Sequence, residues 1–333
     1  MTTVRSSNRK DFHEEAEKGT EKAENMDFLI KPIGLILKFF SDLTGGNFAL
    51  AVLLFTILVN LLLLPLSIKS QKSNAGQTRI KPKVDALRKK YGDDKARFNT
   101  ELSRLYQEEK ISTAGGCLPM VIRMIFIMAI YYCVTQPLSI ILQISDDVIN
   151  TAVAALANQG ITVQSNYNEL AILNNLDKLG DAGAGIVDKA QTLNFSLFGL
   201  DLTQTPKFSL NIFGDFQWIW IIPILSFVTA MLTSVLSMRM QKKMNPDAPS
   251  MAVMMLTMPL ISLWLAFTVP GAVGLYWIYS NLISGGVQLV VSHVYSPYKI
   301  IANDHAKAAM KRKDDEKIRM ARAALREAEE ENA

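Results

Sequence analysis

Five long apolar segments constrain this chain more than any other feature of its sequence. They lie at 46–68, 116–136, 215–238, 251–269 and 271–295. Each is close to the roughly 20 residues that a helix needs to cross about 30 Å of hydrocarbon. A soluble domain of 333 residues would instead spread its apolar residues along amphipathic helices and strands. We therefore expect an all-α membrane protein with five transmembrane helices.

A shorter apolar segment, 26–45, precedes the first predicted span. Lys31, Lys38 and Asp42 interrupt it, so we expect an amphipathic helix that lies in the membrane interface. A sixth span is the alternative interpretation of this segment. Residues 1–25 form a polar tail that lacks the apolar stretch of a secretory signal.

The distribution of basic residues predicts the orientation, because Lys and Arg are retained on the cytoplasmic side. The 69–115 connection holds 12 basic and 6 acidic residues, whereas the 137–214 connection holds 3 basic and 7 acidic residues. With five spans, the 69–115 connection, the 239–250 loop and the 296–333 tail all lie on one side. We therefore expect a multi-pass protein of the cytoplasmic membrane with its N-terminus outside and a basic, mixed-charge tail in the cytoplasm.

The predicted cytoplasmic region at 69–115 has a helical pattern of its own. The segments KPKVDALRKKY and KARFNTELSRLYQEEK each show helical spacing, and YGDD between them is typical of a turn. We expect a helical hairpin that projects from the membrane, with a solvated charged loop as the alternative. The fold of the extracytoplasmic 137–214 loop is not predicted.

The residue types inside the spans exclude several functions. Apart from Asp215 at a boundary, no span contains Asp or Glu, and ion-coupled transporters place such carboxylates in the membrane. No HExxH or GxSxG motif occurs. Cys117 and Cys133 lie far apart in one span and suggest neither a disulfide nor a metal site. We expect no enzyme, no cofactor and no metal.

Two polar residues interrupt the apolar spans at a similar depth. Arg123 lies about 10 Å, and Asn60 about 13 Å, from the predicted cytoplasmic entrance at 1.5 Å per residue. Thr56 extends the polar stripe by one turn. Since a buried arginine is costly in hydrocarbon, we expect a hydrated cavity that is open to the cytoplasm and attracts polar or acidic peptide segments. The alternative is that Arg123 snorkels to the headgroups.

Four segments carry a resemblance to a known family. They are FTILVNLLLLPLSIKSQKS, KPKVDALRKKYGDDKARFNTELSRLYQEEKIS, GGCLPMVIRM and TVPGAVGLYWIYSNLISGGVQ. In this order they resemble the YidC/Oxa/Alb-type membrane protein insertases, in the short form found in Gram-positive bacteria. The resemblance covers about residues 26–295 and is weakest in the external loop.

The resemblance implies a function and a set of sites. It implies a five-helix core that inserts nascent membrane proteins through a hydrophilic groove, alone or with the Sec translocon, and uses no nucleotide or metal. Membrane lipids surround this core, the basic tail contacts ribosomes, and no specific nucleic-acid sequence is recognised. The groove residues that it implies are Arg123, Asn60, Thr56, Tyr276 and Trp277. The basic residues of the receiving hairpin are Lys83, Arg88, Lys89 and Lys90.

The chain departs from the family pattern at two positions. The family normally has arginine where this chain has Asn60, and glutamine where it has Arg123. We interpret the pair as a compensated exchange in which the positive charge has moved to the neighbouring helix. The alternative is that the arginine function is lost and that Arg123 is accidental.

Two other functions remain open from sequence alone. A small-solute transporter or channel would show ion-driven flux or an internal repeat between the two halves. A structural assembly factor would give no crosslinks between groove residues and nascent chains. We expect the insertase.

Overall fold

The computed structural model describes residue 28 and residues 30–109, 111, 118–161, 167–209, 214–244 and 252–331. The predicted tail at 1–25 and Cys117 lie outside these residues. The described residues fall into two compact units, one within the ranges 1–61, 122–238 and 250–284 and the other within 62–121, 239–249 and 285–333.

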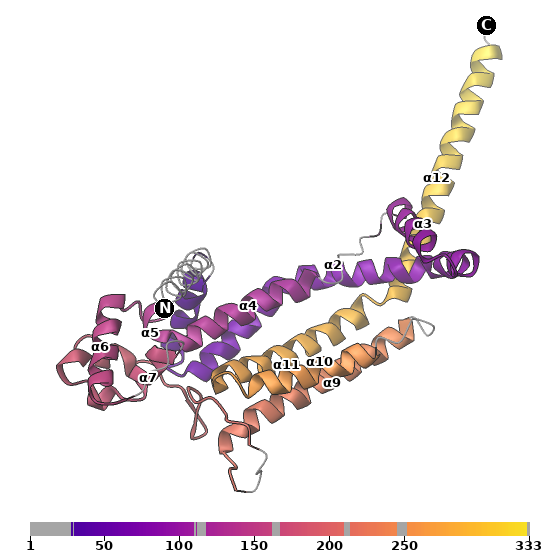
Figure 1. Cartoon of the computed structure of the whole chain (residues 1–333). Coiled ribbons are helices and arrows are strands. Elements are labelled where there is room, and N and C mark those ends of the chain that lie inside the picture. Colours follow the sequence, from indigo (N-terminus) through magenta and orange to yellow (C-terminus); the bar gives the residue numbers. More distant parts are fainter. Residues whose placement is uncertain are drawn as a thin grey trace, which may run out of the picture. The chain divides into compact units, whose positions relative to one another are not determined.

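Helices make up most of both units, as the apolar and amphipathic segments predict (Figure 1). A helix without a label covers residues 30–43. The labelled elements are α2 Phe48–Tyr91, α3 Lys95–Glu108, α4 Leu118–Thr135, α5 Pro137–Ile140, α6 Asp146–Asn158, α7 Asn168–Leu173, η3 Leu176–Lys178, η4 Gly180–Gly183, α8 Val187–Ala190, β1 Ser196–Leu197, β2 Leu200–Asp201, η5 Trp218–Trp220, α9 Ile221–Met244, α10 Ala252–Ala266, α11 Gly271–Val294 and α12 Pro297–Glu331.

Two helices of the described chain are long and apolar enough to cross a membrane. They are Phe48–Tyr91 and Trp218–Met240, and two shorter apolar helices cover Val121–Thr135 and Leu256–Ala266. The predicted all-α membrane class is therefore supported by two helices of spanning length and composition.

The first predicted span continues into the predicted hairpin without a break. Helix α2 runs for 44 residues and contains Pro65 and Pro82. It ends at Tyr91, and α3 begins at Lys95, where the Asp94 carboxylate accepts a hydrogen bond from the Arg97 backbone N–H at 3.0 Å. A proline inside a helix removes one backbone donor without necessarily ending the helix, so composition alone did not indicate this continuity.

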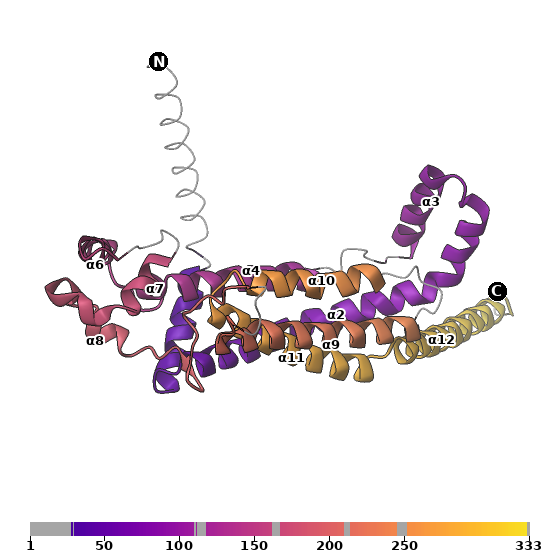
Figure 2. The same ribbon diagram turned by 60° about the horizontal axis from the view of Figure 1, so that its bottom comes forward.

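The first compact unit contains a bundle of apolar helices. The first part of α2 lies beside α4, and α9, α10 and the first part of α11 run alongside one another (Figures 1 and 2). Helices α2 and α4 meet through Phe55 and Phe126, whose ring centroids are 6.0 Å apart in an edge-to-face arrangement. This geometry is favourable for aromatic pairs and sets the relative height of the two helices.

Within the described residues of the 137–214 segment, a buried carboxylate joins two helices. Glu169 on α7 is 4% exposed and accepts hydrogen bonds from the Leu138 and Ser139 backbone N–H groups and from the Ser139 hydroxyl. These donors lie at the start of α5, where backbone N–H groups lack helical partners. Burial raises the pKa of Glu169 above its usual value, although the three hydrogen bonds oppose this shift. Glu169 therefore holds α7 against α5.

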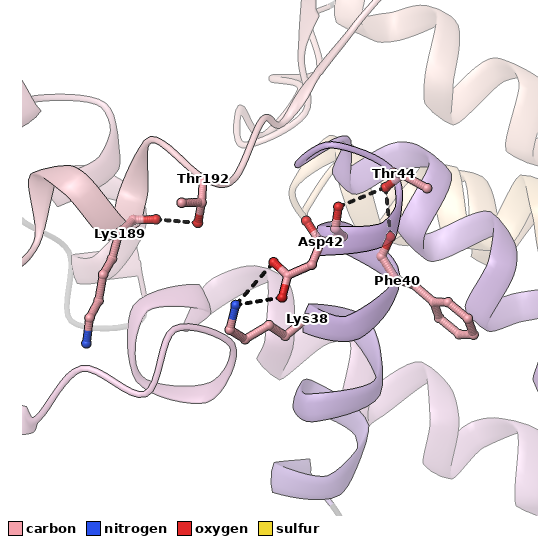
Figure 3. A network of polar contacts seen from close by, with 7 residues as sticks. Lys38, Phe40, Asp42, Thr44, Lys189 and Thr192 are labelled. Atoms are coloured by element: carbon pink, nitrogen blue, oxygen red, sulfur yellow. Dashed lines mark hydrogen bonds and ion pairs between the residues drawn. The ribbon is translucent and has the colours of Figure 1, made fainter.

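A second tether connects this segment to the chain just before α2. The Asn194 N–H donates to the Gly46 carbonyl at 2.8 Å, and the Phe48 N–H donates to the Asn194 carbonyl at 3.0 Å. Nearby, the helix at 30–43 ends in a polar network: Lys38 pairs with Asp42 at 2.9 Å, and the Thr44 hydroxyl donates to the Phe40 carbonyl (Figure 3). The tether fixes where α2 begins.

Candidate functional site

Thr56 and Asn60 form a buried polar stripe on α2. Thr56 is 1% exposed and Asn60 5% exposed. The Thr56 hydroxyl donates to the Val52 carbonyl at 2.6 Å, and the Asn60 amide donates to the Thr56 carbonyl at 2.8 Å. Such bonds to the preceding turn satisfy polar side chains inside an apolar helix. Neither side chain therefore needs a carboxylate or a metal beside it.

Arg123 on α4 is half-buried and lies near Tyr276 on α11. The guanidinium lies close enough to Tyr276 for an electrostatic interaction, and the Tyr276 side chain hydrogen-bonds to Ser280. Tyr276 is 1% exposed, whereas Trp277 beside it is half-buried. Within the described residues, no carboxylate pairs with Arg123, which leaves its positive charge uncompensated.

Asn60 and Arg123 lie at similar heights in the bundle. Taking the contact between Phe55 and Phe126 as the common level, Asn60 is five residues further along α2, about 7.5 Å away along the helix axis. Arg123 is three residues before Phe126 on α4, about 4.5 Å away. Because the two helices run antiparallel (Figure 1), both displacements point the same way. The heights differ by about 3 Å, less than one helical turn.

The structure contains a second polar cluster, between α9 and α11, that was not predicted from the sequence. The Asn281 amide on α11 lies 3.3 Å from the Thr229 hydroxyl and 3.5 Å from the Ser226 carbonyl, both on α9. The Ser226 hydroxyl is buried and has no hydrogen-bond partner in the described chain. Ser226, Thr229 and Thr233 recur at helical spacing in an apolar segment, and this spacing was the signal that could have revealed the cluster.

The four basic residues predicted to receive substrate all lie on the last turns of α2. Lys83, Arg88, Lys89 and Lys90 are exposed. At the turn that follows, Lys90 and Arg97 lie over the Tyr91 ring, at 5.0 and 5.3 Å from its centroid. Cation–π contacts of this kind are worth about 0.5–1 kcal/mol at exposed sites. These contacts help to hold Lys90 and Arg97 close together at this turn, one on each side of the connection between α2 and α3.

Glu109 connects the end of α3 to α2. Its carboxylate pairs with Arg79 at 3.1 Å and with Lys83. The hydrogen bond from Lys83 is the largest cause that lowers the pKa of Glu109 below its ordinary value, and the charges of Lys83 and Arg79 add to it. The carboxylate is therefore ionised and paired at neutral pH, and this pairing is lost only as the pH falls through the lowered pKa.

We expect Glu109→Gln to loosen the contact between α3 and α2. Removing the charge breaks both ion pairs, so amide hydrogen exchange across 95–109 should become about two- to fivefold faster at neutral pH, the modest change expected of exposed pairs. Hydrogen exchange followed by mass spectrometry measures this effect.

Glu108→Gln is the matched control for this variant. Glu108 pairs with Arg104 at 2.9 Å within α3 itself, so its loss removes the same charge without touching α2. Equal exchange rates in the two variants would show that Glu109 does not connect the two helices.

Comparison with known proteins supplies the family context. Residues 39–298 match the family model described as the 60Kd inner membrane protein. The chain is 26% identical over 286 residues to "Membrane protein insertase YidC 2" of Listeria innocua, an alignment that covers 85% of this chain and 76% of that protein. It is 27% identical over 288 residues to "Membrane protein insertase YidC" of Agrobacterium fabrum, covering 86% of this chain and 39% of that protein.

Proposed function

Because this chain belongs to the YidC/Oxa1 family of inner membrane proteins, we propose that it inserts nascent membrane proteins through a hydrated groove lined by Arg123, Asn60, Thr56, Tyr276 and Trp277. The family consists of membrane insertases and not of enzymes. The main observation in support of a hydrated groove is the uncompensated charge of Arg123, which lies at nearly the same height in the bundle as Asn60. A cation in that position is tolerable when water reaches it.

The groove residues suit the physical task of an insertase. A nascent chain must move a polar or acidic segment past hydrocarbon while its apolar segment partitions into lipid. A hydrated site partway across shortens the apolar distance for the first segment, and its positive potential attracts acidic side chains more strongly than in bulk water. Transfer of the apolar segment into lipid is favourable by itself.

The proposed topology has five spans, with the N-terminus outside and the α12 tail in the cytoplasm. It is supported by the excess of basic residues in 69–115, 239–250 and 296–333. In this topology the exposed hairpin residues Lys83, Arg88, Lys89 and Lys90 meet substrate first. The basic tail reaches ribosomes, and the Sec translocon is a further partner.

Site-specific photocrosslinking tests the groove directly. A photoreactive residue at position 60, 123 or 276 is expected to crosslink to a ribosome-stalled nascent membrane protein in native membranes. Position 224 on α9, where Ile224 is 46% exposed, is a control at a lipid-facing site. Crosslinking from position 224 that equals that from 60, 123 and 276 would contradict a groove at these residues.

A further inference from the structure

A cavity of about 560 Å³ lies within the second compact unit, outside the groove residues. Its walls come from α2, the segment after α3 and the first turns of α12, and include Lys69, Lys72, Gly76, Arg79, Ile300 and Lys307. We propose that this cavity binds the phosphate headgroup of an anionic phospholipid. The proposal rests on the proposed topology, which places this part of the chain at the cytoplasmic face of the membrane.

The α2 wall is a basic stripe along one face of the helix. Lys69, Lys72, Gly76 and Arg79 are separated by three, four and three residues, a spacing that places them on one side of an α-helix. Gly76 leaves room for Ile111, since a Cβ there would lie 3.3 Å from the Ile111 side chain. Ile111 therefore packs directly against α2 between the basic residues and forms the apolar part of the lining there.

The basic side chains of the cavity are only partly compensated. Four basic and two acidic residues line it. The two carboxylates are those of Glu109 and Asp304. Glu109 is already paired with Arg79 and Lys83. In the part of the chain that the structure describes, none of Lys69, Lys72 and Lys307 forms an ion pair. The cavity thus offers several unpaired ammonium groups, and a phosphate is the anion whose charge density suits such a cluster.

The remaining lining favours a lipid over free phosphate. Ala75, Ile111, Ile300 and Ile301 supply apolar surface, which a glycerol backbone and the first acyl carbons cover but inorganic phosphate does not. Tyr295 also lines the cavity, and Lys72 lies 5.8 Å from its ring centroid. Such an amphipathic ring suits the headgroup level of a membrane.

The cavity is lined by residues that directly follow the apolar helices, so it lies next to the membrane lipids that would be its ligand. Lys69 is the first residue after the predicted span at 46–68, and Tyr295 directly follows the last residue of α11, Val294. Both ends of the lining therefore meet the membrane surface, where anionic headgroups are concentrated. Soluble phosphate has no such local enrichment.

Native mass spectrometry of the full chain, released from nanodiscs of equal parts phosphatidylglycerol and phosphatidylcholine, tests the proposal. The wild-type chain is expected to retain phosphatidylglycerol selectively. A Lys69→Gln/Lys72→Gln/Lys307→Gln variant is expected to retain at least about tenfold less, since each Lys near a membrane surface contributes measurably to anion binding. The corresponding triple Lys→Arg variant keeps the charges and is expected to retain the lipid.

The matched control removes the same charge further along α12. Lys311→Gln/Lys313→Gln/Lys317→Gln alters three exposed lysines that do not line the cavity and should leave retention unchanged. Equal retention by the two glutamine variants would overturn the site, and displacement by 10 mM inorganic phosphate would overturn its assignment to lipid. Because retention does not depend on insertion, failure here leaves the photocrosslinking test of the groove unaffected.

Discussion

The Asn60→Leu/Arg123→Gln double variant is expected to insert a membrane protein with an acidic tail at least tenfold more slowly than the wild-type chain. The first change removes a buried amide from α2, and the second removes the uncompensated cation near Tyr276. A loss of only about 1.4 kcal/mol of stabilisation for the passing tail corresponds to tenfold in rate. Insertion into proteoliposomes, followed by protease protection of the tail, measures the change.

Two further variants make this result specific. Asn60→Arg/Arg123→Gln returns the cation to α2 at nearly the same height and should restore insertion. Arg239→Gln removes one positive charge at an exposed position on α9 and should insert normally. If the Asn60→Leu/Arg123→Gln variant performs as well as Arg239→Gln, the proposed exchange of charge between the two helices is wrong.

Gly46→Ala is expected to lower the free energy of unfolding by about 3 kcal/mol or more, as large losses do when a strained backbone and an overlap coincide. Gly46 has φ +88°, and an added Cβ would lie 2.5 Å from the Thr192 carbonyl oxygen. That oxygen belongs to backbone, so relief requires the tether between Gly46 and Asn194 to move. Unfolding in detergent micelles, monitored by circular dichroism, measures the loss.

Gly45→Ala separates the overlap from the backbone strain. Gly45 also has a positive φ, +67°, but a Cβ there meets nothing within 4 Å. We expect this variant to cost only about 1 kcal/mol, the usual penalty for a non-glycine residue in the left-handed region. Equal losses in the two variants would show that the contact with Thr192 does not stabilise the fold.

Local sequence patterns predicted which segments are helical better than they predicted where each helix begins and ends. The family resemblance is confirmed, and helices form most of the described chain. The segment 46–68 was predicted as a separate span, yet it is part of one helix that continues to Tyr91. Pro65 and the basic residues that begin at Lys69 both suggest a helix end near residue 69. A helix can nevertheless continue through a proline or a charged residue when its remaining backbone hydrogen bonds are made.

The sequence by itself determined that this chain is an apolar, helical membrane protein and that its basic residues are most concentrated in residues 69–115. Both properties follow from composition within single segments, because the bilayer acts on length and charge. Only the tertiary structure decided that Arg123 lies near Tyr276, that the Asn281 amide hydrogen-bonds to Thr229, and that Lys69 and Lys307 line one cavity. These contacts join residues distant in the chain, and helical periodicity defines a face but not the partner that the face meets.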